Sequence, residues 1–241
     1  MDLKALETQI AKAARSWGDD LKAALVKSLG ETEGLKVAEV FAHAFPASYR
    51  ERFDPETALG DIERVTQCAA QKNVCIHVYQ VPGAVGGTVH IKIYALGTPL
   101  PLSDVMPVLE NMGFKVIGEE PFHIMPRGSA GGGGPVWIHD FDMTVASQQP
   151  VNLAKAKPEI EEAFRRAWAG EMESDGFNRL VPFADLGWRA VTILRAYAKF
   201  LRQAAFPFSQ AYIENAFSPT IYPLRSTPSP TPTRTASSGA T

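Results

Sequence analysis

The sequence predicts an α+β protein, with helices near the N-terminus, a small antiparallel sheet in the middle and more helices toward the C-terminus. Three observations predict this class. Apolar residues recur every three or four positions in the outer regions, which is the spacing of helices that bury one face. In the middle region they alternate with polar residues, which is the spacing of half-buried strands. Glycine and proline separate these segments, as they do where elements end.

The first region, residues 1–50, is predicted to be a helical hairpin. Its first helix spans 2–29, where apolar residues recur at helical spacing: Leu3, Leu6, Ile10, Ala14, Trp17, Leu21, Leu25 and Leu29. Gly30 is the type of residue that ends a helix. The second helix is expected from residue 31 to about 45, because Pro46 cannot continue it.

The second region, residues 54–146, begins with a predicted helix whose N-cap is Asp54. Two strands follow at 74–79 and 89–94, where the apolar period changes to two, and a glycine-containing turn joins them into a hairpin. A second helix is expected after them, capped by Ser103-Asp104 and closed by Gly113.

Two more strands, at 114–124 and 136–145, complete the second region. The order is therefore α-β-β-α-β-β, which is the ferredoxin-like order βαββαβ with its first strand moved to the end. A four-stranded antiparallel sheet with both helices on one face is the expected architecture, because each helix can then bury its apolar stripe on the sheet.

After a polar linker at 146–157, residues 158–217 are predicted to be helical. Helices are expected at 159–169 and 186–204, with a shorter one starting at Ser209. The tail, 218–241, consists mostly of proline, serine and threonine and is predicted to be disordered.

Composition excludes several classes of function. A formal net charge of −2 gives no electrostatic basis for binding nucleic acid or an anionic membrane. No apolar run approaches the roughly 18–20 residues that span a bilayer, and the N-terminus lacks the apolar core of a signal peptide. Cys68 and Cys75 are too few and too widely spaced for a disulfide framework or a CxxC site. A cytoplasmic protein is therefore expected.

No motif in the sequence predicts catalysis. The glycine run at 128–134 leads into a predicted strand, whereas a phosphate-binding loop must open a helix, so a strand connection is expected there. The sequence also lacks a nucleophile elbow, a Walker A loop and an HExxH pair. Four histidines in predicted strands leave a metal-binding module as an alternative, although their spacing is poor for zinc: His77, His90, His123 and His139.

Arginine is abundant in the C-terminal helices, where it predicts a solvated or inter-domain face. The residues are Arg165, Arg166, Arg179, Arg189, Arg195 and Arg202. Aromatic residues are also frequent there, and part of this apolar surface is expected to pack against a partner.

Five segments, taken in order, resemble the large bacterial NAD-specific glutamate dehydrogenases over roughly residues 35–215. They are Phe45-Pro-Ala-Ser-Tyr-Arg-Glu51, the segment Pro101–Ile117, Val136-Trp-Ile-His-Asp-Phe141, Asp175-Gly-Phe-Asn-Arg-Leu180 and Ser209-Gln-Ala-Tyr-Ile-Glu214. Each segment alone is a weak signal, but their combination is specific. The middle segments resemble the ACT-type regulatory region of that family, which implies a ferredoxin-like fold.

The resemblance implies an enzyme that oxidises L-glutamate to 2-oxoglutarate and ammonia with NAD. The family's Rossmann domain and catalytic lysines lie downstream of the matching part, so no catalytic, cofactor-binding or metal-binding residue is carried over to this chain. ACT-type domains often bind amino acids or pair side by side, which implies an amino-acid effector and a homo-oligomer or the rest of the same enzyme as partner. The candidate effector-binding residues are Gly97, Thr98, Ser103 and Asp104, and packing and capping explain Gly97, Ser103 and Asp104 equally well.

In the family, the helix at 209–214 continues toward the catalytic domain, whereas here it runs into the proline-rich tail. A truncated or frameshifted gene product is therefore expected. The sequence leaves two alternatives open to the non-catalytic part of a glutamate dehydrogenase: a free-standing ACT-like amino-acid sensor and a metal-binding module.

Overall fold

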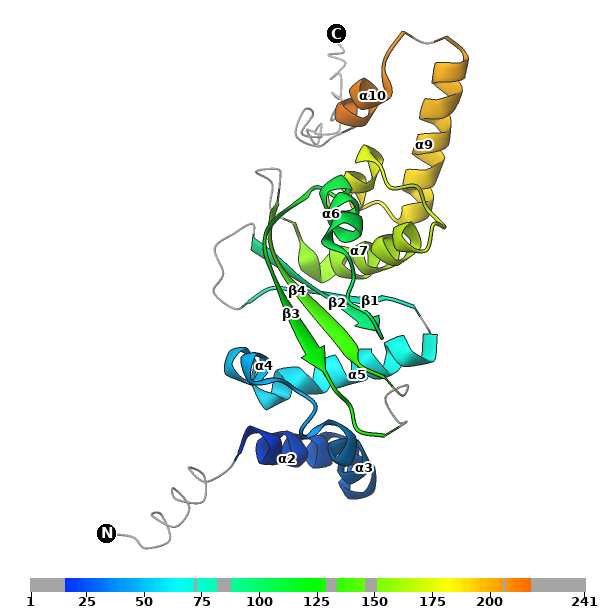
Figure 1. Cartoon of the computed structure of the whole chain (residues 1–241). Coiled ribbons are helices and arrows are strands. Elements are labelled where there is room, and N and C mark those ends of the chain that lie inside the picture. The colour runs from blue at the N-terminus through cyan, green and yellow to red at the C-terminus, as the bar shows by residue number, and fades with distance from the viewer. Residues whose placement is uncertain are drawn as a thin grey trace, which may run out of the picture.

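A computed structural model describes most of the chain, namely residues 16–71, 73–81, 88–128, 134–145, 151–205 and 207–217. Figure 1 shows three layers, with N-terminal helices below a sheet, further helices above it, and a long helix that projects away from the body at the C-terminal end. The part of the first expected helix before residue 16, the turn at 82–87, most of the glycine run and the tail at 218–241 lie outside the described residues.

Three short helices form the N-terminal part: α2 (Trp17–Leu29), α3 (Glu31–Phe41) and α4 (Ala47–Arg52). The first two form the expected hairpin, with Gly30 between them. A Cβ on Gly34 would lie 2.6 Å from the Cα of Val26, so only glycine lets α2 and α3 approach this closely. Ser16 caps α2 reciprocally with Asp19, which satisfies backbone N–H groups at the start of the helix.

Helix α5 (Pro55–Gln71) begins where the sequence predicts, because the Asp54 carboxylate accepts a hydrogen bond from the Thr57 N–H at 2.7 Å. The four strands are β1 (Cys75–Tyr79), β2 (Thr88–Leu96), β3 (Phe114–Ile124) and β4 (Val136–Val145). They form one sheet in the order β1-β2-β4-β3, and every neighbouring pair is antiparallel. The predicted four-stranded sheet is confirmed.

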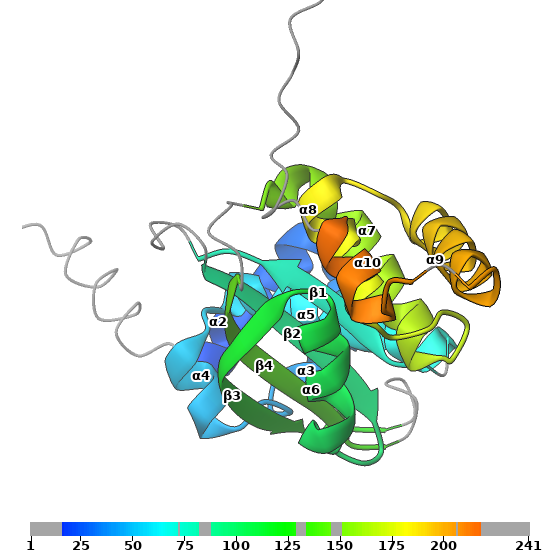
Figure 2. The same ribbon diagram turned by 90° about the horizontal axis from the view of Figure 1, so that it is seen from above.

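The helices cover both faces of this sheet. Helices α6 (Leu102–Asn111) and α7 (Leu153–Trp168) pack on one face, and α5 packs on the other together with the N-terminal helices (Figures 1 and 2). The expectation that the first two helices of residues 54–146 share a face is therefore wrong. The ferredoxin-like pair is α6 and α7, because β2 turns apolar side chains such as Ile93 to one face and Tyr94 to the other, and both faces need a cover.

The C-terminal part consists of a 3₁₀ turn (Gly176–Arg179), α8 (Leu180–Ala184), α9 (Trp188–Gln203) and α10 (Gln210–Ala216). Helix α10 begins after Ser209 as predicted, because the Ser209 hydroxyl accepts a hydrogen bond from the Tyr212 N–H. In contrast, α7 starts six residues earlier than the sequence predicts and contains Pro158.

The linker expected at 146–157 is therefore shorter than predicted. Leu153 and Ala156, in the first turn of α7, are buried in the core that lies on the sheet, and this contact favours helix ahead of the proline. Packing thus outweighs the local preference of the residue before a proline for extended backbone.

A buried ion pair joins α5 to the middle of the sheet. The Lys92 ammonium on β2 lies 2.6 Å from the Asp61 carboxylate on α5, and both residues are at most 3% exposed. The hydroxyls of Tyr49 and Tyr94 also donate to Asp61, at 2.5 and 2.7 Å. Burial, followed by the Asp61 charge, raises the pKa of both tyrosines, so both remain protonated donors at neutral pH.

The ammonium is also enclosed by aromatic rings. Its nitrogen lies 3.6 Å from the centre of the Phe53 ring, with the rings of Tyr49 and Tyr79 at 5.5 and 5.6 Å. Rings at this distance attract a desolvated cation through their negative faces. Three elements, α4 with the residue after it, α5 and the sheet, therefore converge on one charge.

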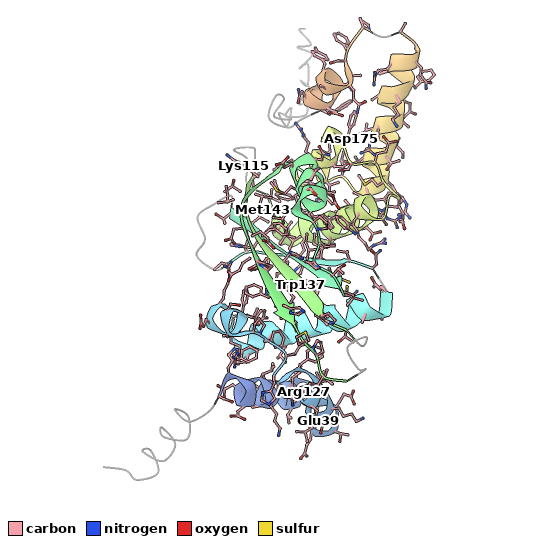
Figure 3. The ribbon with its side chains drawn as sticks, in the orientation of Figure 1. Glu39, Lys115, Arg127, Trp137, Met143 and Asp175 are labelled. Carbon is pink, nitrogen blue, oxygen red and sulfur yellow. The ribbon has the colours of Figure 1, made fainter. Side chains whose placement is uncertain are left out.

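We expect Lys92→Met to lower the free energy of unfolding by about 3–5 kcal/mol, because the substitution leaves the Asp61 carboxylate buried without its cation. Urea denaturation followed by circular dichroism measures this change. Lys115→Met is the matched control, since Lys115 is exposed on β3 (Figure 3) and its replacement should change stability by less than about 0.5 kcal/mol. Equal effects of the two substitutions would show that the buried pair is not the tie between α5 and the sheet.

Candidate regulatory site

A pocket of about 430 Å³ lies beside the end of β2. It is lined by Asn73, Val74, Ala95, Leu96, Thr98, Leu100 and Trp168. Apart from Asn73 and Thr98 these side chains are apolar, so the pocket combines an apolar wall with two uncharged polar groups. Of the four candidate effector-binding residues, Thr98 alone is among those that line it.

The other three candidates lie nearby along the chain but have structural partners. Gly97 has a φ of +79°, a left-handed conformation that favours glycine, and its N–H donates to the Pro135 carbonyl at 2.8 Å. This bond joins the end of β2 to the start of β4. Ser103 and Asp104 are exposed, and the Ser103 hydroxyl donates to the Asp104 carboxylate at 3.1 Å.

The expected N-cap at Ser103-Asp104 is wrong. Helix α6 begins at Leu102, and its N-cap is Pro101, which has extended backbone angles and makes no side-chain capping bond. Ser103 and Asp104 therefore lie inside the first turn, where a carboxylate is favoured by the positive end of the helix dipole. At the other end, Gly113 follows α6 as predicted.

His139 holds the loop that contains these candidates against the sheet. The Leu100 N–H donates to Nε2 of His139 at 3.1 Å, and Nδ1 of His139 lies 2.8 Å from a Glu119 carboxylate oxygen. Because Nε2 accepts a hydrogen bond, the ring proton is on Nδ1 and is donated to Glu119. The sequence suggested His139 as a metal ligand, whereas in the fold it positions a loop.

The remaining strand histidines are distributed over both faces of the sheet. His77 and His90 both stack on Tyr79, with ring centres 5.9 and 5.1 Å from it. His123 stacks on Trp137 at 4.5 Å, and Figure 3 shows Trp137 on β4. Among the residues that the structure describes, no three histidine, cysteine or acidic side chains are grouped so that they could hold a metal ion.

Asp140 follows His139 in the sequence, but the alternation of β4 turns the two side chains to opposite faces of the sheet. Asp140 lies on the opposite face, 1% exposed, where it accepts a hydrogen bond from the Tyr79 hydroxyl at 2.8 Å and pairs with Arg52 at 3.1 Å. Burial raises the pKa of this carboxyl group, against the lowering effects of Tyr79 and the nearby cations. Asp140 therefore belongs to the interface between the sheet and α4.

The Asp175-Gly-Phe-Asn-Arg-Leu180 segment anchors α9. The Asp175 carboxylate caps the 3₁₀ turn and binds Arg195 of α9 through two oxygens, at 2.7 and 2.8 Å. Asn178 accepts a third bond from Arg195 at 2.6 Å. Figure 3 shows Asp175 where α9 meets the helices above the sheet. Arg195 is 3% exposed, so the expected solvated or inter-domain face is wrong for this arginine.

The outer surface of α9 and α10 is rich in apolar residues. Seven large apolar side chains are at least 38% exposed in this region: Ile193, Tyr197, Phe200, Leu201, Phe208, Tyr212 and Phe217. We call this set the C-terminal apolar surface. Ile193, Tyr197 and Phe200 follow helical spacing and so share one side of α9. Exposed apolar side chains gathered on one side of a helix are typical of an interaction site.

The fold and these sites define a class of protein: an ACT-type domain held between helical motifs. Three family models match the chain in this order. "Glutamate dehydrogenase, helical motif 2" matches residues 24–67, "Glutamate dehydrogenase, ACT3 domain" matches 73–156, and "Glutamate dehydrogenase, helical motif 3" matches 172–221.

Curated relatives give the same result. The NAD-specific glutamate dehydrogenase of Halomonas elongata is 40% identical over 212 residues, which cover 88% of this chain and 13% of that protein. The protein of that name from Pseudomonas aeruginosa is 39% identical over 90% of this chain and 13% of its own length. The protein of that name from Mycobacterium tuberculosis is 33% identical over 86% of this chain and 12% of its own length.

The chain belongs to the NAD-specific glutamate dehydrogenase family and spans about an eighth of the length of these relatives. The matching parts, the ACT3 domain and two helical motifs, are non-catalytic portions of that enzyme. None of the helices in the described residues is long and apolar enough to span a membrane.

We expect His139→Ala to lower the free energy of unfolding by about 1–3 kcal/mol, because the Leu100 N–H and the Glu119 carboxylate both lose their partner. The Leu100 amide should also exchange with deuterium faster than in the unaltered chain. His123→Ala, which removes an exposed histidine of the same sheet, should cost less than about 0.5 kcal/mol. An unchanged Leu100 exchange rate would contradict the assignment of His139 as the residue that holds this loop.

Proposed function

We propose that this chain acts as a regulatory and interface part of an NAD-dependent glutamate dehydrogenase, the enzyme class that converts L-glutamate to 2-oxoglutarate and ammonia. The chain itself holds neither the catalytic residues nor the NAD site in this proposal, and it works in the cytoplasm. The observation that carries the proposal is the C-terminal apolar surface, which includes residues of α9, the helix that projects from the body (Figure 1), and of α10 with its flanking residues. Its occupant is the remaining part of such an enzyme.

The inner side of α9 supports this role because it fixes the helix in place. Arg195 is buried against Asp175 and Asn178, and Lys199 pairs with Glu173 at 2.5 Å. The helix is thus held along one side while Tyr197 and Phe200, 66% and 63% exposed, face outward. A preorganised surface loses less conformational entropy when a partner binds than a flexible one does.

The charges on α9 indicate the chemistry of the partner surface. The helix sequence contains four basic residues and no acidic one. Arg189 lies over the Trp188 ring and Arg202 bonds to the uncharged Gln210, so neither of these contacts neutralises the cation. A partner with an apolar centre and acidic groups at its rim would complement this surface.

The test uses a purified polypeptide that comprises the parts of the Pseudomonas aeruginosa relative outside the matched region. We expect it to bind this chain, and we expect Tyr197→Asp with Phe200→Asp to weaken binding at least about tenfold, which is about 1.4 kcal/mol. Biolayer interferometry measures the affinity.

Gln203→Asp is the matched control, since it adds a charge at an exposed position of the same helix and should leave the affinity within about twofold. Urea denaturation of each variant shows whether it remains folded. Absence of binding, or equal weakening by both changes, would contradict the interface proposal. Self-association of the chain that the aspartate pair abolishes would instead assign the surface to a homo-oligomer.

A second proposed function, amino-acid sensing, has a separate observation in its favour. The pocket beside β2 contains Thr98, and His139 fixes the backbone of the loop that leads from Gly97 to Ser103 and Asp104. An uncharged or apolar amino-acid side chain matches the pocket lining, while backbone groups of the loop would contact its polar end.

Isothermal titration calorimetry with each of the common amino acids tests this second function. We expect one of them to bind the unaltered chain and to lose its binding to Thr98→Arg, because the longer side chain fills the pocket. Ser103→Ala changes the other end of the proposed site, on the exposed first turn of α6. Comparing the affinities of the two variants shows which end of the site the amino acid contacts. If none of the amino acids binds, the sensor function fails while the interface proposal stands.

A further inference from the structure

The two cysteines of the chain meet in the fold at the junction between α5 and β1. Cys68 lies in the last part of α5, and Cys75 is the first residue of β1. The sequence gave no reason to link them, because six residues separate them and no motif contains both. In the fold, Cys68 is fully buried and Cys75 is 8% exposed, within one apolar cluster.

Both cysteines lie next to Tyr94 of β2. Its carbonyl lies 3.4 Å from the Cys68 sulfur, and its Cα is the cross-strand partner of Cys75 in the register of β1 and β2. The Cys68 thiol also donates to the Asn73 carbonyl at 2.7 Å, which folds the intervening chain into a tight connection. Both cysteines therefore neighbour the same residue, Tyr94, at the junction of α5 with β1.

The two thiols differ in acidity. Cys75 as a hydrogen-bond donor lowers the pKa of the Cys68 thiol, although burial opposes the change, and the same interaction together with burial raises the pKa of Cys75. Cys68 therefore loses its proton more readily than Cys75, and the bond to the Asn73 carbonyl is given up when it does so. A sulfenic acid formed on one sulfur condenses with a neighbouring thiol to a disulfide.

We propose that Cys68 and Cys75 form a reversible intramolecular disulfide when the chain meets a small peroxide. The Cys68 thiolate attacks one oxygen of hydrogen peroxide, the O–O bond breaks, and the sulfur becomes a sulfenic acid while the second oxygen leaves as hydroxide, which is protonated to water. The Cys75 sulfur then displaces the sulfenic oxygen as a second water. In sum, two thiols and one peroxide give one disulfide and two waters, and a dithiol reductant reverses the change.

The bond would tie together two modules of the family. The match to helical motif 2 ends at residue 67 and the match to the ACT3 domain begins at residue 73, so the two cysteines flank the junction. The bond would also remove the hydrogen bond from Cys68 to the Asn73 carbonyl. Asn73 and Val74 line the same pocket as Thr98, so formation of the disulfide would change the position of residues in the pocket wall.

The experiment treats the reduced, full-length chain with increasing hydrogen peroxide and then blocks free thiols with an alkylating reagent. We expect the folded chain to lose the mass of two hydrogen atoms and to escape alkylation. Trypsin cleaves after Lys72, between the cysteines, so the disulfide should join two tryptic peptides that separate after reduction. The same treatment in concentrated urea, where the thiols are not held together, should give the linkage at least about tenfold more slowly.

The control variants Cys68→Ser and Cys75→Ser should each show no loss of mass and no linked peptides. Circular dichroism during the reaction should show that the chain stays folded, and the oxidised chain should have a higher Tm than the reduced chain. Linkage that forms only in urea, covalent dimers in place of the internal bond, or oxidation that unfolds the chain would each overturn the proposal. The inference rests on the thiol geometry and does not depend on the proposed function.

Discussion

The buried pair of Lys92 and Asp61 is the constraint on which the architecture depends. A lone charge in this position would cost several kcal/mol, so Lys92 can occupy the middle of the sheet only when α5 supplies a carboxylate and the neighbouring rings enclose the ammonium. The hydroxyls of Tyr49 and Tyr94 donate further hydrogen bonds to the carboxylate oxygens of Asp61. The pair therefore specifies where α5 lies on the sheet, whereas apolar contacts alone would tolerate several positions.

A sheet with this pair on one face and an apolar core on the other must be covered on both sides. Helices α6 and α7 provide the ferredoxin-like cover, and α5 with the N-terminal helices provides the second one (Figures 1 and 2). The helical motif that precedes the ACT3 domain is thus part of the same packed unit. A change in the position of α5 would be transmitted to β1 and β2 directly, because the ion pair and the cysteine junction both cross this interface.

The pocket and the C-terminal apolar surface lie on different parts of this unit but share α7. Trp168, near the end of α7, lines the pocket, while Arg166 of the same helix lies 3.8 Å from the Trp188 ring at the start of α9. Helix α7 therefore connects the pocket lining to the start of α9 through directly packed side chains.

Local signals in the sequence were sufficient for most of the elements. The strand periodicity at β1, β2 and β4, the N-caps Asp54 and Ser209, and the glycine after α6 all act within a few residues, so the sequence alone locates them. One failure occurred where a distant contact outweighed a local one, because packing extends α7 across Pro158. The start of α6 was wrong for a local reason, since the extended backbone of Pro101 makes it the N-cap two residues ahead of Ser103.

By itself, the sequence determined the class of fold, the order of the elements and the family, because these follow from periodicity and from motifs read along the chain. Only the tertiary structure decided which side chains meet. It bound His139 to Leu100 and Glu119, buried Arg195 and placed Cys68 and Cys75 next to the same residue, Tyr94. The physical reason is that such contacts depend on the register of the strands and on which face each helix covers, and both are set by the packing of residues far apart in the sequence.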